Sequence, residues 1–452
     1  MELVERIKTM SKTTSPVLII GAGITGLSLG YFLSRKGIPS IVLEKEAQPG
    51  GLARSFHYDG FTFDIGPHRF HTDNQSINQI ILNLLGSEAR HITRQSRVCF
   101  ERRFYPWPLH PSYVLLRFPL HIALSVFLDL FHLYRKAPAK TFKDQIINMY
   151  GPTLFRHFFE GYSSKFLGIV PELTHPDWAQ TGIDRAIIDN RLKIHNLQQL
   201  LFQVLIPRRD PQLRFVYPAG GCGRFAMNLA DQYVRQGGVL RCGQAVEAME
   251  IGGTSITGVQ VSGQRIEPSW VVWTGPVHSL AALLHQPAPD LKYLALVCYN
   301  LILGAGPEFD FQWSYHGRSD VIFSRVSIPK NFDPGNTPSG QRSMCVEVTC
   351  YEEDEIYQNP NRFLDRLLID LKREGLLRTD HEVQTLHLER FPWAYPIYRI
   401  DYRDQLQCLE QNLAGYNNLI RAGRLGSFWY NNMDHCLEAS LRLAEEISSR
   451  SG

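Results

Sequence analysis

Apolar and polar residues alternate along the chain with periods that predict an α/β protein. Residues 17–20 form a short apolar run, 27–33 have helical spacing, and 41–44 form a second apolar run. The N-terminal region is therefore predicted to fold as strand, helix, strand. From 106 to 206 the pattern changes to long amphipathic stretches such as 142–159, which predict a helical insertion.

The second half of the chain returns to short strands. A turn rich in glycine and proline at 217–223 leads into a predicted helix at 225–236, and strand-like runs follow it. Alternating segments such as 343–349 predict an antiparallel sheet, with one helix at 361–374. The end repeats strand, glycine and helix between 419 and 448.

A glycine pattern connects the first strand to the first helix. Gly21 permits a tight turn, Gly23 lets the backbone approach a pyrophosphate, and Gly26 lets the helix pack against the strand. Glu44 ends the next strand, where a carboxylate accepts hydrogen bonds from a ribose diol. These features predict a Rossmann-type dinucleotide site.

The fold class follows from these elements. We predict a discontinuous Rossmann-type domain, a helical insertion and an antiparallel-sheet domain for the substrate. The expected boundaries are 15–100, 207–285 and 406–452 for the three parts of the dinucleotide domain, 101–206 for the helical domain and 286–405 for the sheet domain.

Composition narrows the possible partners. The 47 basic and 44 acidic residues nearly cancel without a block of like charge, so no nucleic-acid surface is expected. The eight cysteines lack metal-ligand spacing and are expected to be reduced, which fits a cytoplasmic protein without a metal site.

The apolar stretch 113–134 is interrupted by charged residues and proline. We expect a buried or peripheral membrane-contacting helix there and no transmembrane segment.

A second glycine pair distinguishes FAD from NAD. Gly50, Gly51 and Arg54 follow Glu44 in a pattern that resembles the extended signature of the amine oxidase and protoporphyrinogen oxidase superfamily. The resemblance implies that this segment continues the pyrophosphate cradle of FAD. Because no cysteine or histidine lies in a recognisable flavin-attachment motif, the FAD is expected to be bound non-covalently.

Further segments along most of the chain resemble UDP-galactopyranose mutase. They are the flavin-facing loop from Phe63 through Gly66, His68 and His71 to Thr72, then Gly161–Lys165, Thr274–Pro276, Phe323–Arg325, Tyr395–Ile397 and Gly423–Asp434. The matches occur in the same order as in that family, which strengthens the expected fold and placement of the cofactor.

The resemblance implies roles for individual residues. His68 and Arg424 would lie beside the flavin ring, and amides around Met433 would face its C2 carbonyl. Tyr395 and Tyr430 would bind the substrate pyrophosphate. Other cofactor contacts are expected at Gly66, Val246 and Gly423; other substrate contacts at Arg325, at Arg185 or Arg191, and at Asn432; the expected catalytic residues are His68, Arg325 and Arg424.

Three departures from the mutase pattern concern the substrate. Leu167 stands where the mutases have a tryptophan near the nucleotide base, and Asn432 replaces an aspartate near the sugar. No arginine takes the place that the mutases fill before the segment containing Tyr395. The identity of the sugar and nucleotide therefore stays open.

Two enzymatic functions and one non-enzymatic function are compatible with these patterns. The favoured one is interconversion of pyranose and furanose rings in a nucleotide-activated sugar through reduced flavin N5. The alternative is an FAD-dependent oxidoreductase of the amine oxidase, protoporphyrinogen oxidase or desaturase type, acting on an amine or apolar substrate. An FAD-binding scaffold is the third, because a flavin fold alone proves no activity.

Overall fold

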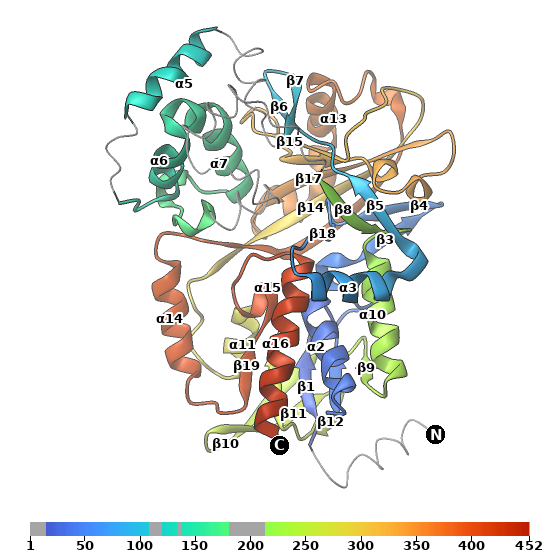
Figure 1. The fold of residues 1–452 in the computed structure, drawn as a ribbon, viewed down its shortest axis with the longest axis vertical. Helices are drawn as coiled ribbons and strands as arrows, with labels where there is room; N and C mark the ends of the chain where they lie inside the picture. Colours follow the sequence, from blue (N-terminus) through green and yellow to red (C-terminus); the bar gives the residue numbers. More distant parts are fainter. Residues whose placement is uncertain (1–14, 108–119, 133–137, 180–212, 452) are drawn as a thin grey trace.

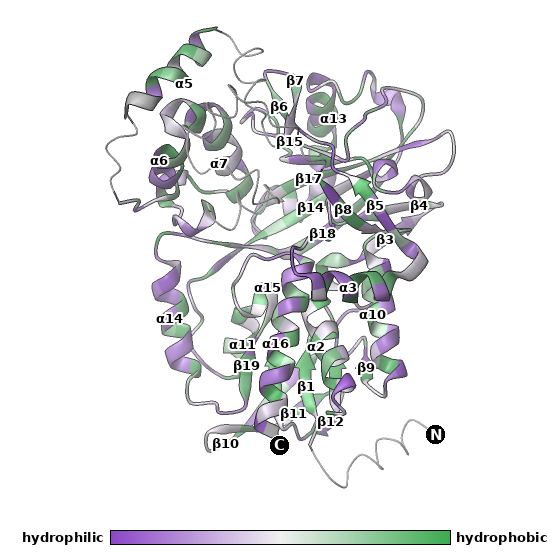
Figure 2. Cartoon of the chain, viewed as in Figure 1, coloured by the Kyte–Doolittle hydropathy of each residue, from purple (hydrophilic) through white to green (hydrophobic). Residues whose placement is uncertain are grey.

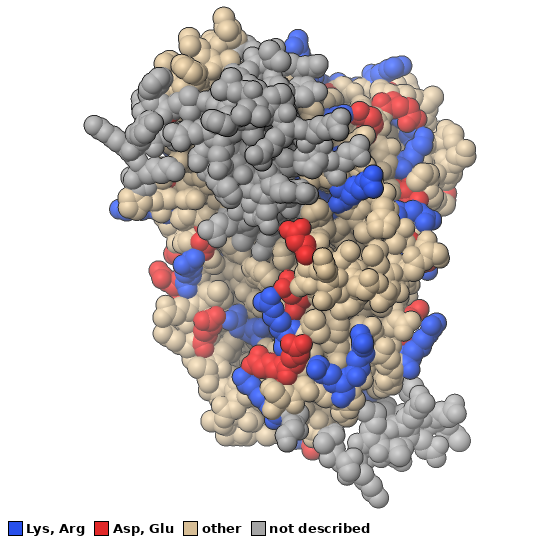
Figure 3. Space-filling view, viewed as in Figure 1, with Lys and Arg blue, Asp and Glu red and all other residues tan. Residues whose placement is uncertain are grey.

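The computed structural model describes residues 15–107, 120–132, 138–179 and 213–451. In Figure 1 a parallel sheet and its helices form the lower part of the molecule, and a larger sheet and a helical group form the upper part. The predicted class, an α/β fold with a Rossmann-type domain, helical insertion and antiparallel-sheet domain, is confirmed. Acidic and basic side chains are interspersed over the described lower face in Figure 3.

The lower sheet has five parallel strands in the order β19, β13, β1, β2 and β9. Each strand is short and mostly apolar because both faces of the sheet are covered. In Figure 2 the strand β1 is green, which marks hydrophobic residues, whereas α10 and α16 carry both green and purple, hydrophilic, residues. Helix α2 packs against both α10 and α16. The elements are β1 (Val17–Ile20), α2 (Ile24–Arg35), β2 (Ser40–Leu43), α10 (Gly223–Arg235), β9 (Val239–Arg241), β13 (Trp270–Trp273), β19 (Leu419–Arg421) and α16 (Met433–Ser451).

Alternate residues of β1 enter two different cores. Val17 and Ile19 pack in the core shared with the three helices. Leu18 and Ile20 belong to a core shared with a small antiparallel sheet on the other face. The remaining elements of this lower part are β10 (Val246–Gly252), β11 (Ser255–Val261), β12 (Gln264–Ile266), α11 (Val277–Leu283), α14 (Tyr402–Leu413) and α15 (Gly423–Gly426).

The upper sheet has seven strands in the order β18, β14, β17, β16, β15, β6 and β7. All neighbouring pairs are antiparallel except β15 and β6, which pair in parallel. This sheet therefore takes two strands from the chain before residue 108. Its elements are β6 (Ser96–Phe100), β7 (Arg103–Trp107), β14 (Lys292–Leu303), β15 (Trp313–His316), β16 (Arg325–Ser327), β17 (Arg342–Cys350), β18 (Val383–Ile397), α12 (Glu355–Gln358) and α13 (Leu364–Arg373).

Two further sheets have two strands each. Strands β3 and β4 pair with each other, and β5 pairs with β8 across a long stretch of sequence. Helix α3 begins after Asn74, whose side-chain oxygen accepts hydrogen bonds from the amides of Ser76 and Ile77 as an N-cap. The elements are β3 (Ser55–Tyr58), β4 (Phe61–Asp64), α3 (Gln75–Leu85), β5 (Ala89–Thr93) and β8 (Arg214–Pro218).

The helical group differs locally from the single helix predicted at 142–159. Helix α6 (Phe142–Leu154) contains Gly151 at φ 85, and a π-helical turn (Phe155–Glu160) connects it to α7 (Gly161–Leu167). A side chain at Gly151 would meet the Asp129 carboxylate at 2.8 Å, so close packing against α5 (Leu120–His132) accompanies the break.

Helix α5 corresponds to the described part of the apolar stretch 113–134. Ile122 and Val126 are buried, whereas Leu120 and Leu124 are exposed. None of the described helices has the length and apolar content that a membrane crossing requires.

Candidate functional site

The first glycine turn has the shape that a pyrophosphate requires. Gly21 has φ 103, and a Cβ there would lie 2.2 Å from Thr274 Oγ1. A Cβ at Gly26 would lie 1.9 Å from the Gly21 carbonyl oxygen, so the helix start must stay close to the turn. A Cβ at Gly23 would meet no atom within 4 Å. Open space therefore lies over the start of α2, where no side chain caps the helix amides.

The second glycine pair closes one side of this turn. Gly50 has φ 116 and Gly51 has φ 55. The Gly50 amide donates to the Ala22 carbonyl at 2.7 Å, and a Cβ at Gly51 would lie 3.1 Å from Gly23 Cα. Arg54 Nε donates to the Gly51 carbonyl at 3.1 Å. The two segments that the sequence assigned to one cradle are therefore in contact.

Glu44 lies at the edge of the same cradle, where its carboxylate contacts the Ala22 amide. Its carboxylate is 8% exposed and accepts hydrogen bonds from the amides of Ala22 at 2.8 Å and Glu46 at 3.0 Å. The Gln244 amide donates to the Glu44 carbonyl at 2.8 Å, which brings the start of β10 at Val246 to this edge. A carboxylate fixed by two amides retains lone pairs for a ribose diol.

The C-terminal segment brings a second helix start to the centre of the molecule. Gly423 has φ 77, and a Cβ there would lie 2.8 Å from Thr25 Oγ1, beside the first turn of α2. Met433 begins α16 and is buried. Asn431 Nδ2 and Asp434 Oδ1, on either side of it, are buried without a hydrogen-bond partner among the described residues.

These features fit FAD. The open cradle at Gly23 suits the pyrophosphate, the Glu44 edge suits a ribose, and the polar groups at the start of α16 suit a flavin ring. Gly66, the other glycine expected at the cofactor, has φ 76 and lies against Glu347, since a Cβ would meet its carboxylate at 2.6 Å. Gly66 thus sets the path of the loop that carries His68.

His68 lies in that loop with an imidazole that stays neutral. Its amide donates to the Gly66 carbonyl at 2.9 Å, and its Nδ1 atom has no partner among the described residues. Burial, followed by the nearby charges of Arg424 and Arg325, lowers the pKa of His68 to about 3. A neutral histidine can donate or accept a hydrogen bond at neutral pH but cannot stabilise an anion by its charge.

The low pKa of His68 predicts how stability depends on pH. Between about pH 4 and pH 6.5 the unfolded chain gains a proton that folded His68 does not, so the free energy of unfolding should fall by up to about 1.4 kcal/mol per pH unit as pH falls. Denaturant unfolding should show this slope reduced in His68→Gln and retained when the exposed His91 is changed to Gln. An equal slope in all three proteins would contradict the assignment.

A cavity of about 430 Å³ lies beside His68. The walls include five of the residues that the sequence assigned to substrate or catalysis, namely Arg325, Tyr395, Arg424, Tyr430 and Asn432. Strand β16 supplies Arg325, β18 supplies Tyr395, and the segment of 423–434 supplies the other three. The structure thus gathers residues that lie far apart in the sequence, from His68 to Asn432.

Two of the arginines that line the cavity, Arg325 and Arg424, are held differently. Arg325 Nε donates to the Glu347 carboxylate at 2.6 Å, and its terminal nitrogen donates to the same carboxylate and to Tyr395 Oη at 3.0 Å. Arg424 donates to the carbonyls of Ala394 and Asn431. The Arg424 guanidinium also lies 5.6 and 5.2 Å from the ring centroids of Tyr395 and Tyr430.

Several cavity residues were not anticipated from the sequence. They are Arg69, Tyr162, Trp178 and Tyr315. Trp178 stacks on Tyr430 with ring centroids 5.3 Å apart. Leu167 is completely buried, so its position offers no surface for stacking a base. Arg185 and Arg191 lie outside the described residues.

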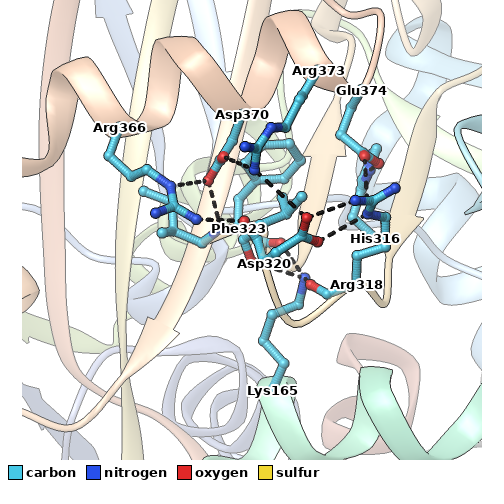
Figure 4. Close-up of polar contacts among 11 residues, drawn as sticks. Lys165, His316, Arg318, Asp320, Phe323, Arg366, Asp370, Arg373 and Glu374 are labelled. Atoms are coloured by element: carbon cyan, nitrogen blue, oxygen red, sulfur yellow. Dashed lines mark hydrogen bonds and ion pairs between the residues drawn. The ribbon is translucent and has the colours of Figure 1, made fainter.

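A buried polar cluster contains His316 and Glu374, with Arg318 beside them (Figure 4). Cys99 and Arg318 also form part of the cavity wall. Ligand atoms of Cys99, His316 and Glu374 lie within 4.8 Å of one another, a closeness that no spacing in the sequence indicated. His316 Nδ1 bonds to Glu374 at 2.8 Å and its Nε2 to Ser314 at 2.9 Å. Arg318 Nε lies 3.8 Å from Glu374, which opposes a cation there. We therefore interpret the cluster as a hydrogen-bonded network.

Lys165, a residue of α7, connects this helix to the network by hydrogen bonds. Its Nζ donates to the carbonyls of Arg318 at 2.8 Å, Val321 at 3.2 Å and Phe323 at 2.8 Å. Three carbonyl acceptors match the three donors of an ammonium group. The segment Gly161–Lys165, which carries Tyr162 on the cavity wall, is thereby fixed to the loop before β16.

The fold and the glycine turns together define a dinucleotide-binding domain, and a cavity lies beside His68. A family model described as an NAD(P)-binding Rossmann-like domain matches residues 19–84. The phytoene desaturase (lycopene-forming) of Pantoea ananas is 37% identical over 92 residues, which cover 19% of this chain and 18% of that protein. The first relatives are therefore matched over about a fifth of their length or less.

Other similar proteins match this chain over nearly its whole length. The coproporphyrinogen III oxidase of Bacillus subtilis (strain 168) is 23% identical over 448 residues, covering 90% of this chain and 92% of that protein. The crystal structure of reduced UDP-galactopyranose mutase superposes with a TM-score of 0.82 at 20% identity, covering 96% and 95% of the two chains. That second likeness concerns the fold.

These comparisons show a Rossmann-like dinucleotide-binding segment and the whole-chain fold, and they make the chain similar to proteins named as a desaturase and a porphyrinogen oxidase. The Rossmann-like segment and the whole-chain fold both imply a flavin cofactor.

Proposed function

We propose that the protein binds FAD non-covalently and acts on a nucleotide-activated sugar, interconverting its pyranose and furanose rings. The observation that carries the proposal is the convergence of arginine and tyrosine side chains on one cavity beside His68. Arginine forks pair with phosphate oxygens in two-point contacts, and tyrosine hydroxyls donate to the same oxygens. A cavity built only for an apolar substrate has no need of such donors.

The residues of the cavity have different roles in the proposed reaction, according to where they lie. Reduced FAD, when bound, supplies a nucleophilic ring atom for the anomeric carbon of the sugar. Tyr395 and Tyr430 hold the diphosphate, with Arg325 keeping the Tyr395 hydroxyl in place at 3.0 Å. Arg424 provides positive charge as the phosphate leaves. His68 remains neutral and is available for a hydrogen bond at the face of the flavin.

The alternative is an oxidoreductase that removes hydride from an amine or apolar substrate. Two observations favour it: the curated relatives include a desaturase and a porphyrinogen oxidase, and Phe100, Phe158 and Trp107 form an aromatic part of the cavity wall.

Cytoplasmic location and peripheral membrane contact by residues 113–134 stay predictions. The eight cysteines, all of which lie among the described residues, form no disulfide.

Incubation of the dithionite-reduced protein with UDP- and GDP-sugars, followed by separation of the products, tests the proposal. We expect ring-isomerised sugar nucleotides from the reduced protein and none from the oxidised protein. Arg424→Met should reduce the rate by about 10²-fold or more, because it removes charge stabilisation at the leaving phosphate. Hydrogen peroxide formation with an amine or apolar substrate, and no isomerised sugar, would establish the alternative instead.

A further inference from the structure

The positive charges of the cavity are not equally available to a substrate. Arg325 faces Glu347, which is 1% exposed and accepts two hydrogen bonds from its guanidinium. The two residues are also direct partners in the register between β16 and β17. A pair held this way has no net charge to offer an anion. The charge that attracts a substrate phosphate must therefore come from other residues.

Arg69 is a charged side chain that nothing in the cavity neutralises at close range. It follows His68 directly and lines the cavity. Its guanidinium lies 4.7 Å from the ring centroid of Trp313, and its Nε is buried without a hydrogen-bond partner among the described residues. Burial lowers the pKa of Arg69, which means that its surroundings disfavour the charged form. Asp434 acts on it only at longer range.

Arg424 has the same lack of a carboxylate partner. Its hydrogen bonds go to two backbone carbonyls, and no carboxylate of the described chain lies within 4.0 Å of either Arg69 or Arg424. Both arginines lie close enough to His68 to lower its pKa. Two guanidinium groups that have no carboxylate partner among the described residues therefore line the same cavity.

We propose that Arg69 and Arg424 together form a dianion subsite that binds the diphosphate of the substrate, while Arg325 orients Tyr395. This inference rests on the proposed function and adds a residue to it. A diphosphate places two negative charges on neighbouring phosphorus atoms, which matches two guanidinium groups at one place. Tyr315 and Tyr430, which interact electrostatically with Arg69, supply hydroxyl donors for the same oxygens.

A binding role and a purely structural role for Arg69 predict opposite effects of its replacement on the stability of the fold. An unpaired buried charge destabilises a folded protein, and sites for anions commonly tolerate this cost. Replacing Arg69 by methionine, which keeps contact with Trp313 but removes the charge, should leave the melting temperature unchanged or raise it. If Arg69 stabilised the fold through Trp313, the same change would lower the melting temperature.

The test is calorimetric titration of the FAD-loaded protein with inorganic pyrophosphate, UDP and succinate. We expect Arg69→Met to weaken pyrophosphate and UDP binding by about 10- to 100-fold, the scale of a lost charge-assisted hydrogen bond. Arg69→Lys should bind with intermediate affinity because it keeps charge but not the fork. Arg94→Met is the matched control, since Arg94 also lies over Trp313, at 5.1 Å, but is not part of the cavity wall.

The outcomes separate this inference from the proposed function. Pyrophosphate binding that is equal in wild type and Arg69→Met overturns the subsite and leaves the proposed function standing. No binding of UDP or pyrophosphate by the wild type overturns both. Tighter binding of succinate than of pyrophosphate, lost in Arg69→Met, assigns the arginine pair to a carboxylate substrate and overturns the diphosphate.

Discussion

Arg325→Ala is expected to lower the free energy of unfolding by about 3–5 kcal/mol, because it leaves the buried Glu347 carboxylate without its partner. The Glu347 side chain is 1% exposed and that of Arg325 is 12% exposed. Glu347 also packs against Gly66, so its displacement would disturb the loop that carries His68. Chemical denaturation, with flavin content measured in parallel, gives the change in stability.

The control for this prediction removes both charges. Arg325→Met combined with Glu347→Leu should recover most of the lost stability, since an apolar pair of similar size can replace a buried ion pair. Arg362→Ala breaks an exposed pair with Glu355 and should cost no more than about 1 kcal/mol. A loss of less than about 1 kcal/mol in Arg325→Ala would mean that Glu347 finds other partners or takes up a proton.

Local sequence patterns predicted much of the fold. Period-two alternation at 343–349 and the apolar run at 17–20 correspond to β17 and β1, and the glycine turns lie where the helices begin. The pairing of β6 with β15 was not predictable, because Ser96 and Trp313 are brought together by a long-range register. The break at Gly151 also depends on a contact from another helix, with Asp129.

In the candidate site, too, residues in recognisable segments were predicted from the sequence, whereas residues whose role depends on a distant partner were missed. His68, Arg424 and Tyr430 were identified because they lie in recognisable segments, and the cavity brings them together. Glu347 was missed because its alternating strand gives no sign of the arginine opposite it in β16. Arg69 was missed because a single arginine within a loop carries no information about whether a carboxylate will pair with it.

Gly23→Val should abolish FAD retention while leaving the protein folded. A Cβ at Gly23 meets no protein atom within 4 Å, and Gly23 has φ −70, which any residue can adopt. The chain alone therefore tolerates the side chain. Valine would instead fill the space over the amides of α2 in which a pyrophosphate must lie, and flavin content should fall by at least about tenfold.

Substitutions at two other glycines are controls that distinguish loss of the cofactor from loss of folding. Gly415→Val places the same side chain at an exposed position with no atom within 4 Å of its Cβ, and should retain full flavin content. Gly26→Val should impair folding itself, because its Cβ would lie 1.9 Å from the Gly21 carbonyl oxygen. Flavin absorbance after gel filtration and far-ultraviolet circular dichroism measure the two properties separately. Unchanged flavin content in Gly23→Val would place the pyrophosphate elsewhere, since the open space over α2 would then have no part in binding it.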